Sequence, residues 1–296
     1  MNDKVLLIGN GINNIKQNYR WVDLINNLIN YIGASGQIRV EDKPFPMLYE
    51  EIFVEAVKNR KFKESNIKNF IAREVTNLEP NDIHEQILET GIGNILTTNY
   101  DLTLEKKYTQ TPETLKNNGA VKESTFSLFR HYSINKTAFW HIHGDANIPG
   151  SITLGYEHYS GYLQQMRNYV ANGTGTAYKI RFEPLIRRLK NKSFTPSSWV
   201  DFFFTKDVYI IGLTLDFIEI HLWWLLTFRQ RLKLIKQAPI TNNIIYFYPD
   251  VLAKTIQNKL DLFRSIGVTP FSVSYQENNK GRYYQSVLKK IKSNLK

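Results

Sequence analysis

Short apolar runs alternate with segments of helical period along the 296-residue chain. The runs end in Gly, Thr, Asn or Asp, which is typical of buried strands that pass into turns. Strands that alternate with helices form a mostly parallel sheet with helices packed on it. The pattern therefore predicts an α/β fold, a Rossmann-like parallel sheet flanked by helices. The expected strands are residues 4–8, 94–98, 137–141, 207–211, 243–248 and 268–274.

Segments of helical period fill the intervals between these runs. Apolar residues recur at helical spacing in residues 21–32 and 67–75. A longer helical block at about 156–204 separates two expected strands, and we expect it to be a helical insertion or lid within a single domain spanning 1–296. If residues from about 282 to 295 form a helix, apolar side chains lie on one of its faces and lysines on the other. The segment therefore predicts an amphipathic helix that closes the fold.

Composition narrows the classes of partner. The chain has 38 Lys and Arg against 27 Asp and Glu, a net charge of +11, which suits anionic partners such as dinucleotides or nucleic acid. It has no cysteine, which excludes disulfides, thiol chemistry and cysteine-based zinc sites. The first apolar run is too short for a signal-peptide core, and residues 217–228 are too short to cross a bilayer, which needs about 20 apolar residues. We therefore expect a cytoplasmic protein with no membrane partner.

Four expected strands pass directly into polar turns, and open α/β sheets bind ligands beyond the carboxyl ends of their strands. In two of these turns glycine directly follows the strand, and glycine lets a backbone approach a pyrophosphate closely. The alternative interpretation is an ordinary tight turn at residues 9–13 and a helix cap at residues 212–216. The residues concerned are Gly9, Asn10, Gly11 and Asn13 in the first turn, and Gly212, Thr214 and Asp216 in the second.

The other two turns carry an amide, a carboxylate and histidines. Thr98, Asn99 and Asp101 follow a buried-strand pattern; Asn99 could orient a ribose or a water, or the residues could serve only as turn and cap. Strand alternation predicts that His141 and His143 point to the same face. Such a pair resembles metal ligands as much as a general base, and two structural histidines are the third alternative.

Taken together and in this order, the four turns resemble the motifs of the sirtuin family, in particular its bacterial defence-type branch. In that family a Gly-x-Gly turn, a Thr/Gln-Asn-x-Asp motif, a His-Gly motif and a Gly-x-Ser/Thr turn jointly hold NAD. The resemblance spans roughly residues 1–250. Further similarities to the branch are Trp21, Pro46, Tyr49, Glu50, residues 152–154 and Tyr159.

The resemblance implies roles for individual residues. His143 is expected to act as the base, Asn99 to position the nicotinamide ribose or the attacking water, and Asp101 to support the pocket. NAD is the expected substrate, with NAD preferred to NADP, and no metal is expected. The resemblance places NAD-binding contacts at Gly9, Asn10, Gly11, Asn13, Thr98, Gly144, Gly212, Thr214 and Asp216.

Departures from the family pattern indicate which reaction to expect. Protein-deacetylating sirtuins usually carry a four-cysteine zinc module and a Gly-Ile-Pro-Asp-Phe-Arg stretch, whereas this chain has no cysteine and reads Gly-Ile-Asn-Asn at residues 11–14. Water is therefore the favoured acceptor, giving an NAD⁺ glycohydrolase that depletes NAD in anti-phage defence. The alternatives are an NAD-dependent deacylase or ADP-ribosyltransferase, or a non-catalytic NAD or ADP-ribose sensor that binds nucleic acid.

We expect other molecules to restrain such an enzyme, because a chain of 296 residues leaves no room for an added ligand-sensing domain. We expect a homo-oligomer, with a HerA-type ATPase as a candidate partner. Two basic runs could contact nucleic acid directly, although such runs are more often solvated helix faces. They are Arg181, Arg187, Arg188, Lys190 and Lys192, and Arg229, Arg231, Lys233 and Lys236.

Overall fold

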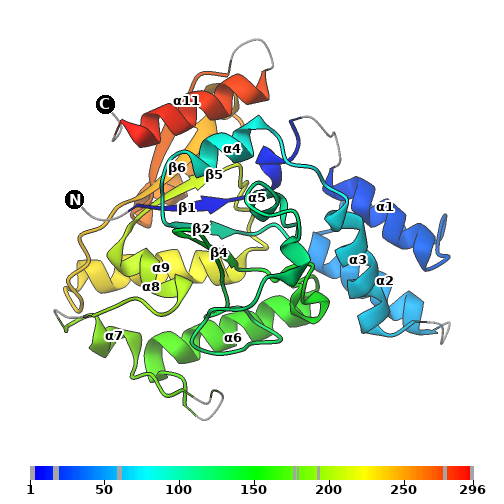
Figure 1. Cartoon of the computed structure of the whole chain (residues 1–296), viewed down its shortest axis with the longest axis horizontal. Helices are drawn as coiled ribbons and strands as arrows, with labels where there is room; N and C mark the ends of the chain where they lie inside the picture. The colour runs from blue at the N-terminus through cyan, green and yellow to red at the C-terminus, as the bar shows by residue number, and fades with distance from the viewer. Residues whose placement is uncertain are drawn as a thin grey trace.

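A seven-stranded sheet forms the centre of the molecule, with strands in the order β3-β4-β2-β1-β5-β6-β7. In this computed structural model, helices cover both of its faces (Figure 1), so the predicted α/β fold class is confirmed. The structure describes residues 4–15, 20–58, 62–175, 178, 180–191, 194–275 and 279–293.

The six expected strands are all present, and their ends differ from the expected ones by one residue at most. The strands are β1 (Lys4–Ile8), β2 (Asn94–Thr97), β3 (Tyr132–Ile134), β4 (Thr137–His141), β5 (Asp207–Ile211), β6 (Ile244–Pro249) and β7 (Thr269–Val273). The sequence did not predict β3, which pairs antiparallel with β4 across a tight turn at Asn135 (φ 55°). A strand of three residues is too short to show an alternating pattern.

Alternate side chains of the central strands enter two separate cores, as the two-residue period of a strand requires. In β1, Val5 and Leu7 belong to the larger core and Leu6 and Ile8 to the smaller one. Figure 1 shows α6, α8 and α9 on one side of the sheet and α4 and α11 on the other. These helices are α4 (Asp82–Leu88), α6 (Tyr156–Asn172), α8 (Trp199–Thr205), α9 (Ile220–Leu234) and α11 (Lys280–Lys292).

A third core lies beside the carboxyl ends of the strands, within a group of three helices (Figure 1). They are α1 (Trp21–Tyr31), α2 (Phe45–Lys58) and α3 (Glu64–Thr76). Leu28, Ile52 and Ile71, one from each helix, are completely buried there. The remaining helices are α5 (Thr103–Lys106), α7 (Leu185–Arg188) and α10 (Gln257–Ser265).

The helical block expected at 156–204 contains α6, α7 and most of α8. Its longest helix, α6, packs against α9, and Tyr162 and Met166 are completely buried in the larger core. The block thus contributes to the layer that covers one face of the sheet, and its description as an insertion or lid stays a prediction. The assignment of the chain to a single domain stays a prediction.

The closing helix is α11, and Val287 and Ile291 on its apolar face are completely buried. Positions 294 and 295 of the expected helix lie outside the described residues. Within the part of the chain that the structure describes, no helix combines the length and the apolar character needed to span a bilayer.

Candidate active site

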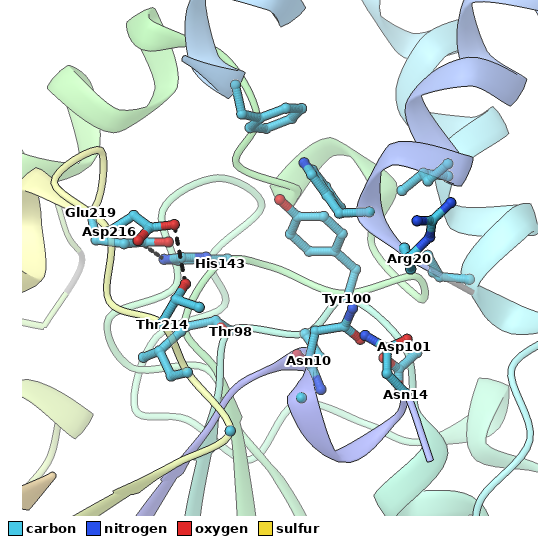
Figure 2. Close-up of a pocket in the computed structure, with 18 of the residues that line it drawn as sticks. Asn10, Asn14, Arg20, Thr98, Tyr100, Asp101, His143, Thr214, Asp216 and Glu219 are labelled. Carbon is cyan, nitrogen blue, oxygen red and sulfur yellow. Dashed lines mark hydrogen bonds and ion pairs between the residues drawn. The ribbon is translucent and has the colours of Figure 1, made fainter. Parts of the chain in front are cut away.

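A cavity of ≈ 390 Å³ lies where the carboxyl ends of β1, β2, β4 and β5 meet the group α1–α3. We call it the strand-end pocket. Nine of the predicted site residues line it: Asn10, Gly11, Thr98, Asn99, Asp101, His143, Gly212, Thr214 and Asp216. Figure 2 shows His143, Glu219 and Thr214 on one side of the pocket and Arg20, Asp101 and Asn14 on the other. The other three predicted residues, Gly9, Asn13 and Gly144, are not among the lining residues, although each is adjacent in sequence to one of them.

The glycines of the first turn are required by packing against the turn after β5. A Cβ at Gly9 would lie 2.5 Å from the Gly212 oxygen and 2.6 Å from the Leu213 Cα. A Cβ at Gly11 would lie 2.9 Å from the same Gly212 oxygen and would also clash with the Tyr284 hydroxyl of α11. These glycines thus leave room for the neighbouring turn, and Gly11 also lines the pocket. Their contact with a pyrophosphate stays a prediction.

Gly144 shapes the turn that follows β4. Its φ is +85°, a region that favours glycine, and a Cβ there would clash with the Ser151 carbonyl. The next residue, Asp145, is completely buried and pairs with Arg130 Nη2 at 3.0 Å. Asp145 Oδ1 also accepts from the Tyr132 hydroxyl at 2.9 Å. This buried network fixes the turn that carries His143.

Asn99 is buried at the end of β2, and its amide oxygen Oδ1 has no hydrogen-bond partner among the described residues. Its backbone is held firmly. The Asn99 N–H donates to Thr97 Oγ1 at 3.0 Å, and its carbonyl accepts from His141 Nδ1 at 2.9 Å. The amide therefore holds a buried, unsatisfied oxygen on a fixed backbone, in a residue that lines the pocket. Such an oxygen suits a group that orients a ligand.

His141 holds the backbone of Asn99 through the hydrogen bond to the Asn99 carbonyl. Its Nε2 lies 2.8 Å from Glu105 Oε1, and both side chains are buried. Burial lowers the pKa of His141, but the charge and hydrogen bond of Glu105 outweigh this and raise the pKa to about 9. A charged imidazolium thus donates to the Asn99 carbonyl and to Glu105 together.

The expectation that His141 and His143 share a face was wrong. The strand β4 ends at His141, so the two-residue period does not extend to His143. His143 instead meets two residues from the start of α9: its Nε2 lies 3.1 Å from His221 Nε2 and 3.1 Å from Glu219 Oε2. Burial, followed by the proximity of His143, lowers the pKa of His221 well below its ordinary value.

Asp101 is held by a buried network. Its Oδ1 accepts from the Thr103 N–H at 3.1 Å, as a helix cap does, and its Oδ2 accepts from Asn13 Nδ2 at 2.8 Å. The Asn13 amide oxygen accepts from His84 Nε2 at 2.9 Å. Burial lowers the pKa of His84 to about 4, so this histidine is neutral at pH 7. These contacts give Asp101 a supporting role, and the predicted catalytic role stays a prediction.

Sequence reasoning missed one whole wall of the pocket. Trp21, Leu24, Phe45, Val75 and Leu78, from the group α1–α3 and the segment after it, form a mostly apolar surface. Trp21 packs edge-on against Phe45, with ring centroids 4.6 Å apart. Helical spacing identified most of these residues as core, and only Trp21 was singled out, through the family resemblance.

Two charged residues that line the pocket, Arg20 and Glu219, were also missed. Glu219 lies at the start of α9, and Arg20 precedes α1 and pairs with Asp23 at 3.3 Å. No short motif surrounds either residue, so only the three-dimensional arrangement reveals them.

The two basic runs do not form continuous charged surfaces. Arg229 is 1% exposed and donates to the Phe203 carbonyl, and Arg188 packs against aromatic rings and pairs with Asp201 at 3.5 Å. The other residues of the runs that the structure describes are exposed, and Lys192 lies outside the described residues. Arg188 and Arg229 therefore serve the core, which contradicts a phosphate-binding role for these two.

In a comparison with protein-family models, residues 93–194 match the SIR2-like domain. The matched segment contains Asn99, Asp101 and His143 and ends before the glycine turn after β5. No curated protein matches the chain. Residues 93–194 are thus similar to the SIR2-like domain, and the Rossmann-like sheet is compatible with that similarity.

Proposed function

We propose that the strand-end pocket hydrolyses NAD⁺, giving nicotinamide and ADP-ribose. The observation that carries this proposal is the unpartnered amide oxygen of Asn99, a residue that lines the same pocket as His143. A buried amide oxygen without a partner costs free energy, so a substrate hydroxyl or an attacking water that satisfies it is a natural occupant. The pocket volume is within the range of sites that bind small molecules.

His143 and Asn99 can supply the base and the hydrogen-bond acceptor that this reaction needs. When the bond between C1′ and the nicotinamide nitrogen breaks, the electron pair leaves with neutral nicotinamide and positive charge develops on the ribose. A water oxygen then bonds to C1′, and its proton passes to the His143 imidazole. Asn99 Oδ1 accepts a hydrogen bond from the ribose or the water and lies next to the developing charge.

The apolar wall suits the same substrate. Trp21 and Phe45 offer aromatic surface for the nicotinamide ring or the adenine. Exclusion of bulk water by this wall strengthens the polar interactions on the opposite side of the pocket.

The test uses purified protein with NAD⁺ in ¹⁸O-labelled water, with nicotinamide and ADP-ribose quantified by mass spectrometry. We expect equal amounts of the two products and one ¹⁸O atom at C1′ of ADP-ribose. A matched reaction with an acetylated peptide added distinguishes hydrolysis from deacylation. Consumption of NAD⁺ only when peptide is present would assign a deacylase, and binding of NAD⁺ without turnover would assign a sensor.

The biological role that we attach to this activity is NAD depletion in anti-phage defence. It rests on the resemblance of the sequence motifs to the defence-type branch of sirtuins. Because such an activity must be restrained in a healthy cell, we also propose control by self-association or by a partner such as a HerA-type ATPase. Cellular NAD measured after infection, with and without the His143→Ala variant, tests this role.

A further inference from the structure

Three ligand-type atoms meet at one edge of the strand-end pocket, where the turn after β4 faces the start of α9. They are His143 Nε2, His221 Nε2 and Glu219 Oε2, and all lie within 4.8 Å of one another. The three residues are buried. The predicted chemistry of the pocket uses His143 and leaves the other two without a task.

The contacts between these atoms are not satisfied by the protein alone. His143 Nε2 is 3.1 Å from both His221 Nε2 and Glu219 Oε2, yet one ring nitrogen carries at most one hydrogen. Glu219 Oε2 accordingly has no hydrogen-bond partner within the described chain. A single cation placed among the three atoms would satisfy them together.

The spacing matches that of a tetrahedral transition-metal ion. Zinc lies about 2.0–2.1 Å from histidine nitrogen and about 2.0–2.2 Å from carboxylate oxygen, so two ligands of one tetrahedral ion are about 3.3 Å apart. Both 3.1 Å separations at His143 are close to that value. Two imidazoles with one carboxylate form a ligand set that zinc enzymes use, leaving a fourth position for water.

The surroundings also suit a bound ion. The Tyr159 ring lies 5.7 Å from each of the two histidine rings, and the Tyr162 ring lies 4.9 Å from that of His221. Such a shell of aromatic rings limits access of water to the ligands, except from the pocket itself.

We propose that His143, Glu219 and His221 bind one divalent transition-metal ion, Zn²⁺ fitting best, and that the ion inhibits the enzyme. The second part rests on the proposed NAD hydrolysis. A metal ion on the His143 imidazole withdraws the electron pair that would accept a proton, and it adds positive charge beside the developing positive charge of the ribose. Occupancy by metal and catalysis by His143 therefore exclude each other.

Calorimetric titration of tag-free protein with Zn²⁺ tests the site without any assay of activity. We expect one Zn²⁺ per chain for wild type, and binding weakened at least about tenfold in His221→Ala and in Glu219→Gln, since each removes one ligand. Co²⁺, monitored by its visible absorption, is expected to give a four-coordinate spectrum that the same variants lose. Mg²⁺, which prefers six oxygen ligands, is expected not to bind.

His131→Ala is the matched control. His131 is a half-buried histidine outside the cluster, stacked on Trp140 with ring centroids 4.1 Å apart. We expect this variant to bind Zn²⁺ as wild type does. Circular dichroism of each variant checks that it is folded, and Glu219→Gln, which keeps the shape of the side chain, provides a second variant if His221→Ala does not fold.

Two results would overturn the metal site: no Zn²⁺ binding by wild type, or equal affinity in wild type and a folded His221→Ala or Glu219→Gln variant. NAD turnover measured across the same Zn²⁺ titration tests the inhibition, which chelation by EDTA should reverse. Unchanged or faster turnover with Zn²⁺ bound would overturn the inhibition alone. If the protein has no NAD turnover, the proposed function and the inhibition fail, while the titration still decides whether the metal site exists.

Discussion

The two walls of the strand-end pocket are built in different ways. The strand-end wall, formed by the turns that carry Asn99, Asp101 and His143, presents polar atoms on a backbone held by buried hydrogen bonds. The helical wall, formed by α1–α3, presents apolar side chains such as Trp21 and Phe45 that pack against a separate core. The difference separates two tasks: the first wall positions chemistry, and the second gives the pocket its shape and excludes water.

Within the strand-end wall, most polar groups support one another, and Asn99 Oδ1 is an exception. This contrast predicts that activity and stability respond to different residues. In Asn99→Ala we expect NAD turnover to fall about 100-fold or more. The free energy of unfolding should change by less than about 1 kcal/mol, because no hydrogen bond to the amide oxygen is lost.

The control for that prediction is Asn13→Ala, which removes an amide from the turn after the neighbouring strand β1. The Asn13 amide bonds to both Asp101 and His84. Its removal leaves the buried Asp101 Oδ2 without this donor, and His84 Nε2 keeps only the Thr103 hydroxyl. We expect urea denaturation to show a loss of about 2 kcal/mol or more. Equal loss of stability in both variants would contradict the distinction between a ligand-facing and a supporting amide.

Among these variants, we expect Arg130→Met to lose the most stability, because Arg130 pairs with Asp145 in the turn that carries His143. This change leaves the Asp145 carboxylate buried without its cation, which costs about 3–5 kcal/mol. Denaturant unfolding measures the loss in the free energy of unfolding for Arg130→Met and for the double variant Arg130→Met/Asp145→Leu, each compared with wild type. The double variant should be more stable than Arg130→Met, because no charge is left unpaired; a less stable double variant would contradict this explanation.

The pair beneath Asn99 predicts a dependence of stability on pH. Burial lowers the pKa of His141, but Glu105 raises it above the ordinary 6.5 to about 9. A histidine whose folded pKa is raised stabilises the fold fully below pH 6.5, and this contribution is lost as the pH rises through 9. We expect the stability advantage of wild type over Glu105→Gln to fall by on the order of 2 kcal/mol across that range. A constant difference from pH 6 to pH 10 would show that the pair is not charged.

For the helical wall, we expect a smaller effect, on binding. Trp21→Ala removes apolar surface that contacts the substrate equally before and during the reaction. We expect KM for NAD⁺ to rise about tenfold while kcat stays within about threefold of wild type. A fall in kcat as large as that of Asn99→Ala would show that this wall takes part in the chemistry and would remove the distinction between the two walls.

The strand-end wall could be predicted from the sequence because its residues follow directly after apolar runs. β1, β2, β4 and β5 each end within one residue of the expected position, and their order in the sheet brings the four turns together. The helical wall could not be predicted in the same way. Helical spacing identified Leu24 and Val75 as apolar positions, but only tertiary packing places them over the strand ends.

The contacts of His143 show the same limit. Glu219 and His221 are separated from it in sequence by more than seventy residues and reach it only because α9 begins beside the turn after β4. Strand alternation predicted His141 as the companion of His143, and it failed because the strand ends at His141. A period observed in sequence is informative only as far as its element extends.

The most direct test of hydrolysis at the strand-end wall is the rate of NAD⁺ turnover in wild type and His143→Ala, with His131→Ala as a histidine control outside the pocket. Loss of a general base lowers turnover about 10²- to 10⁴-fold. We therefore predict a decrease of that size in His143→Ala and little change in His131→Ala. Turnover by a folded His143→Ala protein at a rate near that of wild type would contradict the assignment of the reaction to this pocket.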